Sequence, residues 1–338
     1  MLGGAQVVER LDERELVLLV VGPHAVGAAA QPPRPAVQRY RGGLHRARLE
    51  ASLAAGLKSL AQAQGVTLFM VLLAAFKILL SKYTGQSDIV VGSPIANRRW
   101  KEVEGLIGFF VNTQVLRTDL SGSQVRFADI LARVNDMALG AYEHPDLPFE
   151  KLVEVLQPQR SLSYSPLFQV MFDFVNTPAV DLQVGQARLR AMEFELGTTR
   201  FDSTWVVQEE PDGSLGVVVE YDRDLYEGQT VGRIVAHWER LLGQIVQQPQ
   251  ARISDYRLLD AADYRQVVQE WNATEVALDG AGQVLARIQA QAERAPEAIA
   301  VECAQEKLSY GQLWSRVQGV AQRLRAAGIG PEQLVGVG

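Results

Sequence analysis

Length, composition and charge indicate a globular protein and exclude several other classes. The chain has 338 residues, more than one domain usually holds, so we expect one sizeable core and a second, smaller unit. Hydrophobic residues make up 47% and charged residues 21%, which excludes a disordered or collagen-like chain. A formal net charge of -6 lacks the clustered Lys and Arg that nucleic-acid binding requires, so no nucleic-acid partner is expected.

Cysteine usage and hydropathy indicate a cytoplasmic protein with no membrane partner. The single cysteine, Cys303, excludes an intramolecular disulfide and a cysteine-based metal site, which is typical of a reducing compartment. Four scattered histidines have no metal-ligand spacing, so no metal is expected. The apolar run Leu16–Val21 is far shorter than the ~20 residues that span a bilayer and lacks the flanks of a secretory signal. We interpret it as a buried strand.

The first part of the chain alternates predicted helices and strands. Residues 22–35, rich in Ala, Pro and Gly, form a loop after the first strand. The helix over Leu68–Tyr83 is apolar on nearly all sides and is therefore expected inside the core. Gly92-Ser93-Pro94 is predicted to end a strand. The other elements here are strands His45–Leu49, Asp88–Val91 and Phe109–Arg117, and helices Ala51–Gln64, Phe127–Tyr142 and Phe149–Leu156.

Strands dominate the next part, and a long helix closes it. The turn sequence Pro211-Asp212-Gly213 predicts a hairpin between the last two strands. The amphipathic helix Tyr226–Gln247 follows, and no strong period persists over residues 253–279. Trp205 and Trp238 fit the periodic pattern and are predicted to lie in the core. The strands are Phe168–Val175, Leu189–Leu196, Ser203–Gln208 and Leu215–Tyr221, and a second unit has helix Val284–Glu293, strand Ile299–Cys303 and helix Tyr310–Ala327.

Five sequence segments carry a family resemblance. They are Gly92–Arg98, Ile107-Gly108-Phe109-Phe110-Val111-Asn112-Thr113-Gln114 with Arg117, His144-Pro145-Asp146-Leu147-Pro148-Phe149-Glu150, Arg160–Leu167 and Arg200-Phe201-Asp202. In this order they resemble condensation domains of nonribosomal peptide synthetases, whose motifs include GxFVNTQxxR, HQDxPFE and RDxSRNPL. The resemblance implies an α/β fold like that of chloramphenicol acetyltransferase, a mixed sheet with packed helices. The departures are Pro145, Ser161, Tyr164 and Ser165, all in predicted loops.

A second resemblance lies beyond the linker. Trp271-Asn272-Ala273-Thr274 and Leu308-Ser309-Tyr310-Gly311-Gln312-Leu313 look like the entrance to an adenylation domain of the adenylate-forming superfamily. No phosphate-binding loop or adenylation lysine follows in this sequence, so no ATP chemistry is expected. We divide the chain into a degenerate remnant of the catalytic-loop region (1–30), the C-terminal part of a condensation domain (31–251), a linker (252–279) and a truncated start of an adenylation domain (280–338).

The segment where the family has its catalytic motif is altered. The resemblance implies HHxxxDG directly after an apolar strand, with the second His nearest the reacting amine and the Asp in an ion pair. Here Gly22-Pro23-His24-Ala25-Val26-Gly27-Ala28-Ala29 follows such a strand and keeps only the second His. Amide formation needs a group of near-neutral pKa and donors for the oxyanion, which makes His24 the catalytic candidate. The alternative is a loop histidine without a role, because Ala28 replaces its Asp.

Six other motif residues are candidates for the substrate channel or for structural roles. Arg98 would pair with the motif Asp in the family, or here be a solvated or internally paired arginine. Asn112 and Gln114 either line the channel or satisfy buried backbone groups. His144 and Asp146 are expected to provide turn and cap chemistry for the helix from Phe149. The sixth candidate, Arg160, begins the RDxSRNPL-like segment.

The leading hypothesis is a condensation-domain remnant, inactive alone, from a nonribosomal peptide synthetase that makes a secondary metabolite. The intact parent would join an acyl or peptidyl thioester to an aminoacyl thioester, both presented on phosphopantetheine by carrier domains. Its partners would be carrier and adenylation domains, with no cofactor bound directly. Two alternatives remain open: a noncatalytic docking module for those domains, and a lobe completed by a separate chain.

Overall fold

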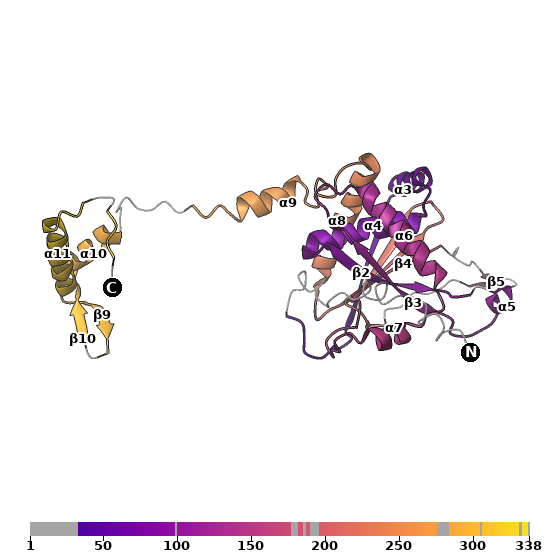
Figure 1. The fold of residues 1–338 in the computed structure, drawn as a ribbon, viewed down its shortest axis with the longest axis horizontal. Helices are drawn as coiled ribbons and strands as arrows, with labels where there is room; N and C mark the ends of the chain where they lie inside the picture. The colour runs from indigo at the N-terminus through magenta and orange to yellow at the C-terminus, as the bar shows by residue number, and fades with distance from the viewer. Residues whose placement is uncertain are drawn as a thin grey trace. The chain divides into compact units, whose positions relative to one another are not determined.

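The chain divides into two compact units in the computed structural model (Figure 1). The division falls between Ala262 and Asp263. The structure describes residues 33–98, 100–176, 182–184, 187–189, 196–275, 284–304, 306–330 and 333–336. The strand predicted over Leu16–Val21 and the histidine at position 24 lie outside these residues.

A six-stranded mixed sheet organises the first unit. Its strand order is β1-β8-β7-β4-β2-β3, with β4 parallel to both of its neighbours and the other pairs antiparallel. The predicted hairpin is confirmed, since β7 and β8 pair antiparallel and the Glu210 N–H donates to the Ser214 carbonyl across the turn. The strands are β1 Gly42–Leu49, β2 Asp88–Ile95, β3 Asn112–Asp119, β4 Val170–Val175, β7 Ser203–Glu209 and β8 Leu215–Asp222; a separate pair is β5 Leu182–Val184 with β6 Ala187–Leu189.

Four helices cover one face of this sheet and share its main core (Figure 1). Helix α4 is the most deeply buried, as its apolar sequence predicted. Trp205 and Trp238 are core residues, which confirms the prediction, and their rings lie 5.7 Å apart in a cluster with Phe76 and Phe172. The four helices are α3 Ala51–Gln64, α4 Leu68–Thr84, α6 Phe127–Glu143 and α8 Gly228–Gln247.

A smaller core lies on the opposite face, under helix α7 (Phe149–Leu156). Strand β2 contributes Val91 to the main core and Val90 to the smaller one, as the twofold alternation of a strand requires. Gly92 lies where Phe168 crosses β2: a Cβ there would come within 2.3 Å of the ring. Only glycine therefore fits this position without moving the ring.

Several strand boundaries differ from the prediction. Strand β2 does not end at Gly92-Ser93-Pro94, because all three residues continue the ladder with β3. Strand β3 begins at Asn112, and Phe109 lies in an exposed loop that follows the short helix α5 (Lys101–Glu104). Of the strand predicted over Leu189–Leu196, Leu189 ends β6, Leu196 lies outside the strands, and the residues between are outside those described.

The second unit is small and largely exposed. The stretch predicted to lack periodicity contains helix α9 (Ala261–Arg265) and a π-helical turn over Gln266–Glu270. Beyond it lie α10 Val284–Arg294, β9 Ile299–Cys303, β10 Glu306–Ser309 and α11 Tyr310–Ala326, of which β10 was not predicted. Ser309 and Gln312 form a capping box at the start of α11.

Membrane-spanning potential was tested on the described helices. None of them alone has the length and apolarity to cross a bilayer, and α3 and α4 meet the criterion only as a pair that is bent by 105°.

Candidate functional site

Two amides on strand β3 hold the loop that connects α6 to α7. Asn112 Nδ2 donates to the carbonyl oxygens of Pro145 (2.9 Å) and Leu147 (2.7 Å). Gln114 Nε2 donates to the carbonyl oxygen of Ala141 at 2.6 Å. Both side chains thus satisfy backbone acceptors of residues 141–147, and they fix this loop against an edge strand.

Gln114 also borders two cavities. One of about 570 Å³ follows the edge of β3 beneath α6 and α7, and its lining includes Arg117, Asp136 and His144. The other, of about 260 Å³, lies between the ends of β2 and β4. The motif strand therefore brings one polar side chain to both spaces.

His144 and Asp146 are both exposed in the loop that Asn112 holds. His144 is the C-cap residue of α6, where its N–H donates to Ala141 O at 3.3 Å. The prediction that His144 or Asp146 caps the helix from Phe149 is wrong, because Pro148 is its N-cap residue and no side chain caps it. Proline fixes its own φ and so begins the helix without a side-chain hydrogen bond.

Arg98 is paired within its own loop. Its Nη1 donates to Leu106 O at 2.9 Å and also to the carbonyl oxygen of Val103, and its guanidinium lies 4.3 Å from the centre of the Phe110 ring. The loop that it organises exposes a continuous run of apolar side chains, which we call the 100–111 loop: Trp100, Leu106, Ile107, Phe109 and Val111.

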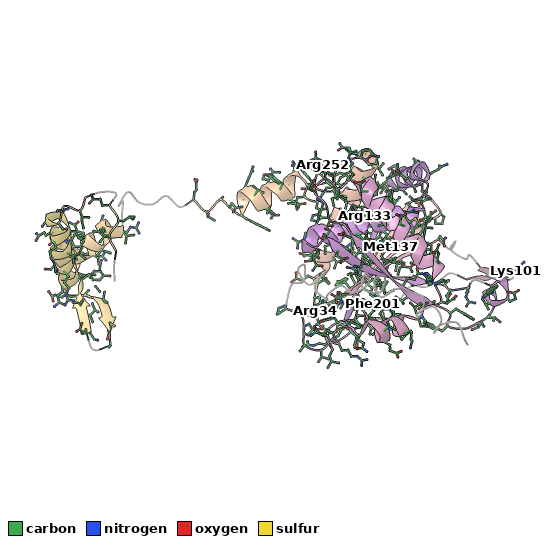
Figure 2. All side chains as sticks on the ribbon, viewed as in Figure 1. Arg34, Lys101, Arg133, Met137, Phe201 and Arg252 are labelled. Carbon is green, nitrogen blue, oxygen red and sulfur yellow. The ribbon has the colours of Figure 1, made fainter. Side chains whose placement is uncertain are left out.

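A buried ion pair, Arg34–Asp202, anchors the segment that resembles RDxSRNPL. Arg34 Nη1 donates to Asp202 Oδ1 at 2.8 Å and to Ser163 O at 3.3 Å. The Ser163 hydroxyl in turn donates to Pro35 O at 2.6 Å. Figure 2 labels Arg34 and Phe201 on the same side of the first unit. Burial raises the pKa of Asp202, and the Arg34 guanidinium opposes that shift.

Arg160 differs from the other candidates because it is exposed, and no described hydrogen bond or ion pair includes it. Sequence reasoning named Arg160 but missed Arg34, which lies in a predicted proline-rich loop. The available signal was an arginine in that loop together with the acid of the RFD turn, two residues of opposite charge far apart in sequence. Their proximity depends on the tertiary fold.

Metal ligation and the catalytic histidine are the remaining candidate features. No cluster of three or more His, Cys, Asp or Glu side chains suited to a metal ion occurs in the part of the chain that the structure describes. His24 is outside those residues, so the structure assigns it no position.

Comparison with known proteins identifies the family. Residues 22–268 match the family described as "Condensation domain". The chain belongs to this family. The condensation domain is 43% identical over 307 residues to a linear gramicidin synthase of Brevibacillus parabrevis, covering 90% of this chain and 6% of that protein. Chondramide synthase of Chondromyces crocatus is 42% identical, with 91% of this chain and 8% of that protein covered.

Solved structures show the same fold. A four-domain nonribosomal peptide synthetase bound to AMP and glycine has a TM-score of 0.76 at 25% identity, over 96% of this chain and 26% of that one. The X-domain from teicoplanin biosynthesis has a TM-score of 0.65 at 26% identity, over 76% and 60%. The expected condensation-domain fold, a mixed sheet with packed helices, is confirmed. The chain spans less than a tenth of the length of the two synthases above.

Proposed function

We propose that the first unit forms one wall of the reaction channel of a peptide synthetase condensation domain. In that reaction the amine of an aminoacyl thioester attacks the carbonyl carbon of an acyl or peptidyl thioester. The new C–N bond forms, the C–S bond breaks, and the thiol of the donor's phosphopantetheine leaves with a proton. Carrier domains would present both thioesters, and no cofactor would be bound directly by this chain.

The observation that carries this proposal is the position of Gln114 between the two cavities. The strand and the loop that resemble family motifs line both spaces, and hydrogen bonds from Asn112 and Gln114 fix their geometry. A pre-organised wall positions reactants without further ordering, which is a large part of enzymatic rate enhancement. Family membership and the shared fold support the same assignment.

We further propose that the chain alone does not catalyse the reaction. His24 has no acid at the motif position, where Ala28 stands, and Arg98 binds carbonyl groups of its own loop. An imidazole without a hydrogen-bonded orienting group lacks a fixed tautomer and direction. The chain covers 60% of the X-domain structure, so a working channel needs the rest of such a domain, in the same polypeptide or in another.

A dipeptide assay tests both statements. The purified chain, given a donor carrier and an acceptor carrier with their thioesters loaded, should form no dipeptide above the uncatalysed rate. Adding a separately produced lobe that carries an intact HHxxxDG motif should restore product, and Gln114→Ala should lower that restored rate. Dipeptide formed by the chain alone at a rate that falls in His24→Ala would contradict the inactivity proposal.

A noncatalytic docking module is the second candidate, and the 100–111 loop favours it. Ile107 and Phe109 are 105% and 92% exposed, which is unusual for large apolar side chains that are close together in sequence. Such a surface normally faces another protein segment. Ile107→Ser with Phe109→Ser should abolish binding of the complementary lobe in a pull-down and leave the melting temperature of the first unit unchanged.

For the second unit we propose the beginning of an adenylation domain. The alignment with the gramicidin synthase covers 90% of the chain and so extends beyond the condensation match. The LSYGQL segment contains the Ser309–Gln312 capping box, and Gly311 passes close to Pro296, where a Cβ would lie 3.2 Å from its carbonyl oxygen. Fusion of residues 263–338 to an adenylation domain that lacks its own start should restore amino-acid-dependent ATP–pyrophosphate exchange.

A further inference from the structure

The cavity between β2 and β4 exists because these two parallel strands separate. They pair at one position, Gly92 with Met171. Beyond it, Ser93–Ile95 of β2 and Asp173 of β4 lie on the two sides of the 260 Å³ space, and residues 67–69 at the start of α4 close one side. Such a volume accommodates a group the size of an amino acid and is below the usual range for large ligands.

The charge of the lining is one-sided. Asp173 is its only acid, and no Lys, Arg or His is among the described lining residues. None of the ion pairs within the described part of the chain includes Asp173. Burial raises the pKa of this carboxyl group, while the Phe174 N–H, which donates to it, acts in the opposite direction. A partly buried carboxylate with one donor and no cation is stabilised when a cationic ligand binds.

The remaining lining suits an organic ammonium group. Phe69 and Phe174 contribute aromatic rings, whose faces attract cations, and Tyr142 and Ser93 contribute hydroxyl groups that accept hydrogen bonds. Gln114 borders the same space and connects it with the motif strand. An acid, two aromatic rings and neutral acceptors together favour a primary ammonium over an anion or a fully apolar group.

We propose that Asp173 binds the ammonium group of the aminoacyl acceptor through a charge-assisted hydrogen bond and so positions the acceptor amine. This inference rests on the proposed condensation function and assigns a residue to one of its substrates. Asp173 is a positioning residue in this proposal, since the ammonium must lose a proton before it attacks.

Binding of a stable acceptor analogue to the whole chain tests the proposal. The probe is alanine joined by an amide to an N-acetylethylamine tail, in which the amide replaces the hydrolysable thioester. Its N-acetylated form, which lacks the cation, is the matched ligand. Titration calorimetry or protein-observed NMR should show that the free amine binds about tenfold more tightly than the acetylated probe, the loss expected for one charged hydrogen bond.

Variants separate Asp173 from the other acids. Asp173→Asn should weaken binding of the free amine about tenfold and leave the acetylated probe unaffected. The control is Asp136→Asn, an exposed acid of the larger cavity, which should change neither. Equal affinity for the two probes, or unchanged binding in a folded Asp173→Asn, would overturn the proposal. The two-probe comparison needs no variant, so it decides even if Asp173→Asn does not fold.

The same design separates this inference from the proposed function. If the amine probe binds through Asp173 but the reconstituted domain forms no dipeptide, the condensation proposal fails and the ammonium site remains. If dipeptide forms at the same acceptor KM in Asp173→Asn, the condensation proposal holds and the role of Asp173 is wrong.

Discussion

The two units of the molecule reach defined secondary structure with very different amounts of burial. The first unit surrounds its sheet with two apolar cores, and the ring of Trp238 is fully buried between helices and strands. In the second unit, Ala292 is the one buried apolar side chain among the described residues from 263 onward. Local signals such as a capping box thus define helices in both units, but packing can stabilise only the first to a large extent.

The largest expected contrast comes from tryptophan removal in each unit. Trp238→Ala should lower the free energy of unfolding of the first unit by about 4 kcal/mol, because it leaves a cavity in the aromatic cluster. Trp271→Ala, at a side chain that is 62% exposed, should change stability by no more than about 0.5 kcal/mol. Urea unfolding followed by circular dichroism measures both, and similar losses would refute the contrast in burial.

Ion pairs provide a second contrast of intermediate size. Asp202→Asn should destabilise the first unit by about 3 kcal/mol, because it leaves the Arg34 guanidinium without its buried partner. Glu302→Gln breaks the pair with Lys307, whose two side chains are 55% and 54% exposed, and should cost about 0.5 kcal/mol or less. Thermal unfolding of the two variants is the measurement. An equal shift would show that the Arg34 network adds nothing to an ordinary surface pair.

Lysine burial gives the smallest contrast, seen in the pH dependence of stability. Lys77 is fully buried, and its Nζ donates to Leu116 O (2.9 Å) and Thr118 Oγ1 (2.7 Å). Burial lowers its pKa to about 7, and Asp88 partly opposes this. Between pH 7 and 10.5 the unfolded chain therefore binds more protons than the folded one, so this lysine makes stability rise with pH in that window.

The corresponding experiment compares Lys77→Met with the unsubstituted chain. The unsubstituted first unit should gain about 1 kcal/mol per pH unit relative to the variant between pH 7.5 and 9.5. Lys307→Met, at an exposed position of the second unit, should leave the pH dependence of the first unit unchanged. Parallel pH profiles for Lys77→Met and the unsubstituted chain would show that Lys77 has an ordinary pKa in the folded state.

Sequence patterns predicted elements well where local chemistry decides. Helices α3 and α7 have the predicted bounds, because their ends coincide with Gly65 and Pro148. The pattern failed where tertiary pairing overrides local preference: β2 continues through Gly92-Ser93-Pro94 because β3 pairs with each of these residues. Turn-forming residues predicted a strand end there, but partner strands determine strand ends.

The candidate site was only partly accessible from sequence, for the same reason. Asn112 and Gln114 were named from their motif, but their acceptors, some thirty residues away, depend on how α6 packs. Lys77 falls within a predicted apolar helix, and Asp173 within a predicted strand. Nothing local shows that one is fully buried and the other borders a cavity, since both features arise where separate elements meet.

The close contact between Gly92 and Phe168 limits how this domain can be redesigned. Any side chain at position 92 would displace the ring at the single point where β2 and β4 meet, and the opening beside Asp173 would change with it. Engineers who wish to alter the acceptor should therefore vary residues beyond this crossing, such as Ser93 or Tyr142, and leave the glycine and the aromatic ring as a fixed pivot.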